Sequence, residues 1–405
     1  MNKKRISIYI DISEFLATRN TTGIQRVIRE LLLRILKDRF TVKIIYYDEG
    51  FKSFVKIQSD EIHAFLKDVK NYQFKLPVAI NIFEERAENK IFFDIDSVWN
   101  AGASRVDLYP KLKKYGFKIF NFIYDLIPVL FPDYLYEKSK LNFPDFIKAV
   151  YRYSDLVIFD SLSTQKDFFK LKEDLNIIRK INTDIVHLGS DYTLYPDKQK
   201  HPYEKLLSQK YILFVGTIEP RKQQLEVLKS FEILQEKYSD LNLVFIGRIG
   251  WDVDEFVNKI ANHPLKNKRI YHLVNIEDNI LSLFYQNAFI VTYLSNYEGF
   301  GLPVVESLAH SNITIISKNS SLNEVGNKFV NYIHHDIQET FIKLVSYYIN
   351  DPNAFHLRKS YIKQNYKSIS WNDFYVNLIN IFEKFDIFTV LVKTEDSIYN
   401  DAYKQ

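Results

Sequence analysis

The amino-acid sequence predicts an α/β protein of two domains. Short apolar runs rich in β-branched and aromatic residues alternate with helical patterns along most of the chain, and one polar stretch interrupts this alternation. A length of 405 residues also exceeds what one hydrophobic core usually serves. We therefore expect two Rossmann-like domains in tandem, with a ligand in the cleft that faces the carboxyl ends of their strands.

The first domain is expected over residues 1–195 and opens with a strand–helix–strand unit. The pattern predicts a strand at 6–10, an amphipathic helix at 23–37 and a second strand at 40–47. Residues 51–90 are charged and weakly periodic, and we assign no element to them. A helical stretch at 146–153 and further strands are predicted at 90–94, 117–124, 156–160 and 185–188.

The second domain is expected over residues 205–370, after a polar linker that contains two prolines and many lysines. A helix is predicted at 221–238, because leucines and a phenylalanine share one face there. Strands are predicted at 211–216, 241–247, 269–274, 288–294 and 313–317. An amphipathic helix should follow at 371–390, and residues 391–405 form a polar tail.

Composition narrows the function classes. The chain has no cysteine, which excludes disulfides, thiolate metal sites and cysteine nucleophiles. A net charge of +4 allows contact with an anionic membrane surface or a phosphorylated substrate, and it does not call for nucleic acid. The basic N-terminus lacks a signal-peptide core, and the longest apolar stretch is too short to span a bilayer. We expect a cytoplasmic protein, with peripheral attachment to the inner face of the cytoplasmic membrane left open.

Residues 295–309 are the strongest candidate for a functional site. They follow an apolar run, contain two glycines and place Pro303 where a helix would begin. The pattern predicts a strand, a tight loop and a helix whose first N–H groups favour an anion such as a pyrophosphate. The backbone amides expected to lie against the ligand are those of Gly299, Phe300, Gly301 and Leu302.

Two carboxylates frame this loop. Glu298 precedes the glycines, and Glu306 lies a turn into the predicted helix. Glu306 suits a vicinal diol such as a ribose, because a carboxylate has two acceptor oxygens. Taken singly, each is better explained without a function, Glu298 as a solvated loop residue and Glu306 as a favourable first-turn charge. Their combination on one strand–loop–helix frame favours a functional site.

A pair of cations follows the predicted strand at 211–216. Gly216 and Thr217 lead into Arg221 and Lys222 at a helix start, where positive side chains ordinarily cost stability. A bound anion would remove that cost, so we expect the pair to neutralise a diphosphate. The alternative is that both side chains simply point into solvent.

Gly23 and Asp125 are the candidates in the first domain. Gly23 begins a helix with exposed amides, and an N-cap without any ligand explains it equally well. Asp125 follows a strand at an edge expected to face the cleft, where it could contact an acceptor hydroxyl. An ordinary aspartate turn is an equal alternative.

No metal site is expected. Asp94 and Asp96 imitate an Asp-x-Asp metal signature, but so short a match arises often by chance, and we interpret it as a strand terminus. The nine histidines show no metal-ligand spacing, and His334 and His335 are adjacent, hence on opposite sides of a regular element.

The chain resembles glycosyltransferase family four, retaining enzymes of the GT-B fold. The resemblance covers roughly residues 205–375 well and the first domain more loosely. It implies that Glu298 lies beside the donor sugar, that Glu306 binds the ribose, and that the last helix crosses back onto the first domain. The motifs that carry it are Phe214–Gly216, Glu219–Lys222, Leu243–Gly247, Glu298–Ala309, Ser320–Val325, Thr22–Arg26, Tyr124–Pro128 and Asp160–Ser163.

Three positions depart from the pattern of that family. Tyr124 stands where many members have a histidine, so a sugar contact by that histidine is in doubt. Gly23 is a single glycine where many members have two, and His310 with Ser311 replaces a small residue and a glycine.

The hypothesis is therefore a metal-independent, retaining hexosyltransferase, with mannosyl transfer favoured. It would use a GDP- or UDP-linked sugar, no resident cofactor, and a saccharide or lipid-linked acceptor in lipopolysaccharide, capsule or other surface glycan assembly. The alternatives are a nucleotide-sugar epimerase or glycoside phosphorylase on the same fold, or a catalytically silent partner subunit of another transferase.

Overall fold

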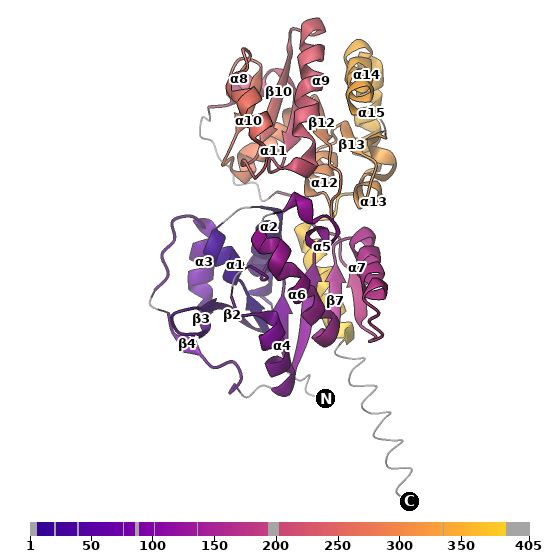
Figure 1. Ribbon diagram of the computed structural model, residues 1–405. Coiled ribbons are helices and arrows are strands. Elements are labelled where there is room, and N and C mark those ends of the chain that lie inside the picture. Colours follow the sequence, from indigo (N-terminus) through magenta and orange to yellow (C-terminus); the bar gives the residue numbers. More distant parts are fainter. Residues whose placement is uncertain are drawn as a thin grey trace, which may run out of the picture.

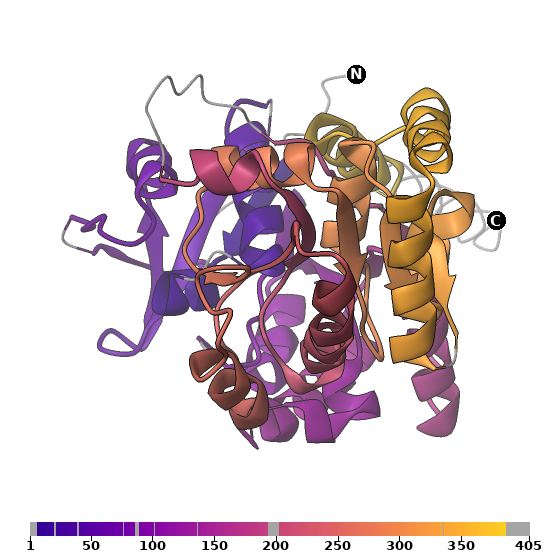
Figure 2. The same ribbon diagram turned by 90° about the horizontal axis from the view of Figure 1, so that it is seen from above.

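The computed structural model describes residues 6–19, 22–38, 40–75, 77–85, 89–100, 102–135, 137–192, 202–334 and 336–385. The predicted tail at 391–405, the end of the last helix at 386–390, His335 and most of the linker lie outside these residues. The described chain forms an eight-stranded and a six-stranded sheet, each with helices on both faces, stacked one above the other (Figure 1). Seen from above, the second sheet and its helices overlie the first (Figure 2).

The first sheet is parallel through β2, β1, β5, β6, β7 and β8, and β3 and β4 extend it with antiparallel pairing. Its strands, in spatial order, are β4 (Ala79–Ile80), β3 (Ser53–Ile57), β2 (Thr41–Asp48), β1 (Ile6–Asp11), β5 (Asn89–Asp94), β6 (Phe117–Ile123), β7 (Leu156–Phe159) and β8 (Asn182–Ile185). The helices of this part are α1 (Ser13–Thr18), α2 (Gly23–Ile35), α3 (Ser59–Lys67), α4 (Arg105–Lys114), α5 (Ile127–Leu130), α6 (Glu137–Tyr153) and α7 (Leu162–Asp174).

The second sheet is parallel throughout. Its spatial order is β11 (Ile270–Leu273), β10 (Leu241–Ile246), β9 (Lys210–Val215), β12 (Ile290–Tyr293), β13 (Thr314–Ser317) and β14 (Asn331–Ile333). Its helices are α8 (Glu204–Leu207), α9 (Gln224–Lys237), α10 (Asp254–Ala261), α11 (Asp278–Asn287), α12 (Leu302–Ala309), α13 (Leu322–Gly326), α14 (Ile337–Asn350) and α15 (Pro352–Asn365).

The strand order of the second sheet reverses between β9 and β12. The chain proceeds outward from β9 through β10 to β11, then returns to β12 on the other side of β9. In parallel α/β sheets a crevice opens at the carboxyl ends of the two strands where the order reverses. The loop after β9 holds the cation pair and the loop after β12 holds Glu298, so this topology brings the cations and Glu298 to one place. Glu306 lies on α12, which follows the second loop.

Three predictions of local structure are corrected. The strand expected at 185–188 is β8, Asn182–Ile185, whose polar side chains suit a sheet edge and hid it in the sequence. Residues 51–90, left unassigned, contain β3, α3 and β4. The helix expected from residue 221 begins at Gln224, after a separate 3-10 turn, Pro220–Lys222.

The C-terminal helix, residues 371–385, packs on the first sheet (yellow in Figure 1). Its apolar face joins the core around β1, β5 and β6, with the ring of Phe382 centred 5.0 Å from those of Phe93 and Phe120. The backbone at Gly189 leaves room for the start of this helix, since an added Cβ would lie 2.6 Å from Trp371. The chain thus crosses between the two stacked parts twice.

Candidate active site

The loop between β12 and α12 has the predicted form. Gly301 caps α12 in a left-handed conformation, φ +101°, which favours glycine, and Pro303 lies in the first turn. Side chains at the start of α13 hold the loop in place: the Ser320 hydroxyl accepts from the Glu298 N–H at 3.0 Å, and Ser321 donates to the Glu298 carbonyl at 2.9 Å. The position of Glu298 is therefore set by several hydrogen bonds.

Glu298 is buried and lies between two donors. Its Oε1 is 2.5 Å from the Arg221 Nη1 and accepts a hydrogen bond from the Tyr293 hydroxyl at 3.0 Å. Burial alone would raise the pKa of the Glu298 carboxyl, but the charges of Arg221 and Lys222 outweigh it and hold the pKa below its usual value. A negative charge is thus kept in a site with little water.

The two cations are already paired in this structure. Arg221 reaches Glu219 at 2.8 Å as well as Glu298, and Lys222 reaches Glu219 at 3.2 Å. We predicted that two cations at a helix start would lower stability. This prediction is wrong, because both residues lie in a turn before α9 and face carboxylates. The alternative, that both side chains simply point into solvent, is excluded, since only 13% of the Arg221 and 10% of the Lys222 side chain is exposed.

Gly216 and Thr217 lie beneath this pair, at the end of β9. An added Cβ on Gly216 would be 3.3 Å from the Lys222 Nζ, so the lysine side chain lies close over the glycine. The Thr217 carbonyl accepts from the Gln224 side-chain amide at 2.9 Å, which ties this loop to the first turn of α9.

Glu306 lies on the inner face of α12 and is engaged on both oxygens. Oε1 pairs with Nη1 of Arg26 at 2.5 Å, and Oε2 accepts from the Tyr285 hydroxyl at 2.9 Å. Burial raises the pKa of the Glu306 carboxyl above its usual value, although the Arg26 charge opposes this. Because Arg26 comes from α2, this contact joins the two stacked parts of the protein.

The glycine loop lies directly against the first part of the chain. The Gly299 carbonyl accepts from the Ser161 hydroxyl at 2.6 Å, and a Cβ added at Gly299 would be 1.9 Å from the Tyr124 carbonyl oxygen. The side chains of Phe300 and Leu302 pack with the first core. An added Cβ on Gly23 would lie 3.4 Å from Leu302, so the starts of α2 and α12 face each other.

Asp125 combines the two interpretations left open by the sequence. Its Oδ1 accepts from the Ile127 N–H at 3.0 Å, which is an aspartate turn. It also lies within electrostatic reach of Arg221 and Glu298. Burial raises the pKa of Asp125 to about 6, with Arg221 opposing the shift and Glu298 adding to it.

We expect Asp125→Asn to become more stabilising, relative to the wild type, as pH rises. The folded-state pKa of about 6 exceeds the ordinary value of 3.8, so the aspartate stabilises the fold below about pH 4 and loses that contribution as pH rises through 6. Asparagine keeps the turn and cannot ionise. Urea unfolding of both proteins between pH 4 and 7.5 should show a difference that grows by up to about 3 kcal/mol. A difference that is flat or shrinks with pH would contradict this.

Asp94 and Asp96 lie at the end of β5, as interpreted from the sequence, and serve the first core. Arg105 pairs with Asp94 at 2.7 Å and with Asp11 at 2.6 Å, and all three side chains are buried. Asp96 accepts from the backbone N–H of Phe15 at 2.7 Å. These carboxylates hold loops after neighbouring strands together.

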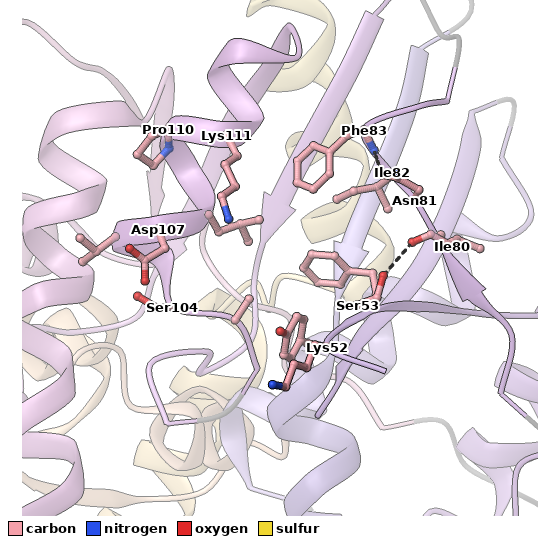
Figure 3. A pocket seen from close by; sticks show the side chains of 15 residues that line it. Lys52, Ser53, Ile80, Asn81, Ile82, Phe83, Ser104, Asp107, Pro110 and Lys111 are labelled. Atoms are coloured by element: carbon pink, nitrogen blue, oxygen red, sulfur yellow. Dashed lines mark hydrogen bonds between the residues drawn. The ribbon is translucent and has the colours of Figure 1, made fainter. Parts of the chain in front are cut away.

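A hollow of about 610 Å³ lies elsewhere, between β3, the segment after β4 and the start of α4. Figure 3 shows Asp107 and Lys111 from α4 on one side and Asn81 to Phe83 on the other. Its lining includes none of the residues predicted for the site.

Of the described helices, none combines the length and apolarity needed to cross a membrane.

Four side chains at the site were not predicted to act there: Glu219, Tyr285, Tyr293 and Arg26. Glu219 and Arg26 occur in the motifs that carry the family resemblance, which was the available signal. Tyr285 and Tyr293 occur within ordinary apolar patterns, so nothing in the sequence separates them from core tyrosines.

Comparison with known proteins points to the same class of protein as the geometry of this site. Residues 197–368 match the family described as "Glycosyl transferases group 1". The "Serotype-specific mannosyltransferase WbdA" of Escherichia coli is 27% identical over 320 residues, and the match covers 74% of this chain and 37% of WbdA. The "O-antigen chain mannosyltransferase B" of Escherichia coli is 29% identical over 190 residues, 43% of this chain and 49% of that protein.

The chain thus spans just over one third of the length of WbdA. Among solved structures, Anabaena HepE in complex with UDP-glucose superimposes with a TM-score of 0.65 and 13% identity, over 94% of this chain and all of HepE. At this identity the likeness concerns the fold, and it agrees with two Rossmann-like sheets facing each other. Residues 197–368 are thus similar to the family of glycosyl transferases group 1, and the architecture is the GT-B fold.

Proposed function

We propose that the protein is a retaining, metal-independent glycosyltransferase that moves a hexosyl group, mannosyl above others, from a nucleoside diphosphate sugar to a saccharide or lipid-linked acceptor. The observation that carries the proposal is the placement of Arg221, Lys222 and Glu298 together at the reversal of strand order. Glu306 lies on α12, the helix that follows the Glu298 loop, opposite the start of α2. The relatives reported above are named as mannosyltransferases, one of them of the O-antigen chain, which supports mannose as the sugar and a role in surface polysaccharide assembly.

The charges of the site suit departure of a diphosphate. Arg221 and Lys222 are held close together by Glu219, and a bound diphosphate would offer them several anionic oxygens in its place. As the sugar–phosphate bond lengthens, negative charge grows on the leaving oxygen, and fixed cations stabilise it without reorganisation. The first N–H groups of α12 add to this stabilisation.

Glu298 would act on the sugar side of the breaking bond. Its ionised carboxylate stabilises the positive charge that develops on the sugar ring. Retention follows if the acceptor attacks from the face that the diphosphate leaves, with a phosphate oxygen taking the acceptor proton. Asp125, from the opposite part of the chain, is proposed to position the acceptor hydroxyl.

Thermal-shift binding tests the proposal. UDP, GDP, ADP and CMP are added to the purified protein with and without EDTA. A nucleotide at a hundred times its dissociation constant should add about 2.7 kcal/mol to the free energy of unfolding. We expect one nucleoside diphosphate to stabilise the protein, EDTA to leave the shift unchanged, and Glu306→Gln to reduce it.

The other outcomes separate the alternatives. Stabilisation by none of the four nucleotides would favour a silent partner subunit. A shift that needs metal would contradict metal independence. Release of the free epimerised nucleotide sugar from the matching donor, without transfer to an acceptor, would favour an epimerase.

A further inference from the structure

Helix α2 covers one of the two candidate carboxylates. Arg26, in the first turn of α2, extends its guanidinium across the interface to Glu306, with Nη1 2.5 Å from Oε1. The pair is well buried, because 12% of the arginine and 5% of the glutamate side chain are exposed. With Tyr285 on the other oxygen, both oxygens of Glu306 are engaged by side chains of the protein itself.

Two aromatic rings hold Arg26 in this position. The guanidinium carbon is 4.1 Å from the ring centroid of Tyr192 and 5.8 Å from that of Trp371. A cation is attracted electrostatically to the face of an aromatic ring, so both contacts stabilise the guanidinium where it lies. Tyr192 and Trp371 lie where the chain passes between the stacked parts, so the position of Arg26 depends on how these parts are arranged.

The arrangement leaves one hydrogen bond unmade. The Nε of Arg26 is buried and has no acceptor within the described part of the chain. A buried donor without an acceptor loses its hydration and gains nothing in return. The contact with Glu306 is therefore weaker than a fully satisfied buried ion pair, and a ligand that binds Glu306 can displace it.

We propose that Arg26 is an occluding residue for the donor site: it pairs with Glu306 in the free protein and must leave before the ribose hydroxyls of a nucleoside diphosphate can bind that carboxylate. This inference rests on the proposed function, which assigns Glu306 to the ribose. If only a fraction of the protein molecules has Glu306 free to bind a ligand, the apparent dissociation constant equals the intrinsic constant divided by that fraction. Arg26 thereby makes donor binding depend on movement between the two parts.

The same helix supplies a matched control. Arg29, three residues on, makes an ion pair of the same kind with Asp278 of α11, at 2.8 Å, and touches neither glutamate of the site. Replacing either arginine removes one charge and one ion pair across the interface. Only the replacement of Arg26 frees Glu306.

Binding kinetics of UDP and GDP to the full chain test the inference by stopped flow, with calorimetry for the affinity. We expect Arg26→Gln to raise the association rate constant about tenfold and to leave the dissociation rate constant unchanged, because occlusion acts on the free protein alone. Arg29→Gln should behave as the wild type. If Arg26→Gln does not fold, as judged by circular dichroism, Arg26→Lys keeps the charge without the planar fork and should show a smaller increase.

Three other results have distinct meanings. Faster dissociation in the Arg26 variant would mean that the arginine contacts the ligand, which overturns the inference. Equal acceleration in the Arg26 and Arg29 variants would point to a general loosening of the interface and overturn it as well. If the wild type and both variants bind neither nucleotide, the proposed function itself fails.

Discussion

Replacing Glu298 with glutamine is expected to lower glycosyl transfer by about 10²- to 10³-fold, the loss typical of removing one preorganised electrostatic contact. The physical reason is charge. Glutamine keeps the size of the side chain and an acceptor for Tyr293, but it cannot stabilise a cationic sugar. Binding of the nucleoside diphosphate should persist, because Arg221 and Lys222 remain and lose a competing carboxylate.

The measurement is kcat with the donor whose nucleotide stabilises the protein, together with the affinity for that nucleotide. Glu226→Gln is the control, since Glu226 makes a half-exposed ion pair with Lys229 at 2.9 Å on α9. Exposed pairs contribute little, and kcat should stay within about threefold of the wild type. Full turnover in the Glu298 variant would show that this carboxylate takes no part in the reaction.

Gly299→Ala is expected to have the second large effect. An added methyl group would lie 1.9 Å from the Tyr124 carbonyl oxygen and 2.9 Å from the Asp125 Cβ, closer than such atoms can approach. Because this contact joins the two stacked parts, they can relieve the clash by moving apart. A displacement of about 1 Å at a reacting centre costs about 10²-fold in rate, so kcat/KM should fall at least that far.

Small-angle X-ray scattering should show a larger radius of gyration for Gly299→Ala, and the kinetics should be measured on the same sample. Gly50→Ala is the matched control, because its added Cβ would meet only the flexible side chain of Asp48, at 3.2 Å. We expect that variant to keep the dimensions and the activity of the wild type. An unchanged radius with full activity in Gly299→Ala would mean that the close contact with Tyr124 is not needed for catalysis.

Most strands of the fold were predictable because buried parallel strands are continuous apolar runs. β1, β9, β10 and β13 were each placed to within a residue or two. β8 was misplaced because an edge strand carries polar side chains. β3 and β4 were missed because they are short, and α3 because charged residues interrupt its apolar pattern. In these segments tertiary packing, and not local pattern, decides the structure.

Local sequence patterns were enough to predict the α/β class, the strand–loop–helix frame around Glu298 and Glu306, and the cations at the end of the neighbouring strand. These are local features, since they depend on apolar periodicity, glycine conformation and proline at a helix start. The partner of each charge could be identified only from the folded chain. Arg221 lies between two glutamates, and Arg26 covers Glu306. A buried charge needs a partner of opposite sign, and Arg26 and Glu298 are partners that come from segments far from the residues they pair with, so local patterns could not reveal them.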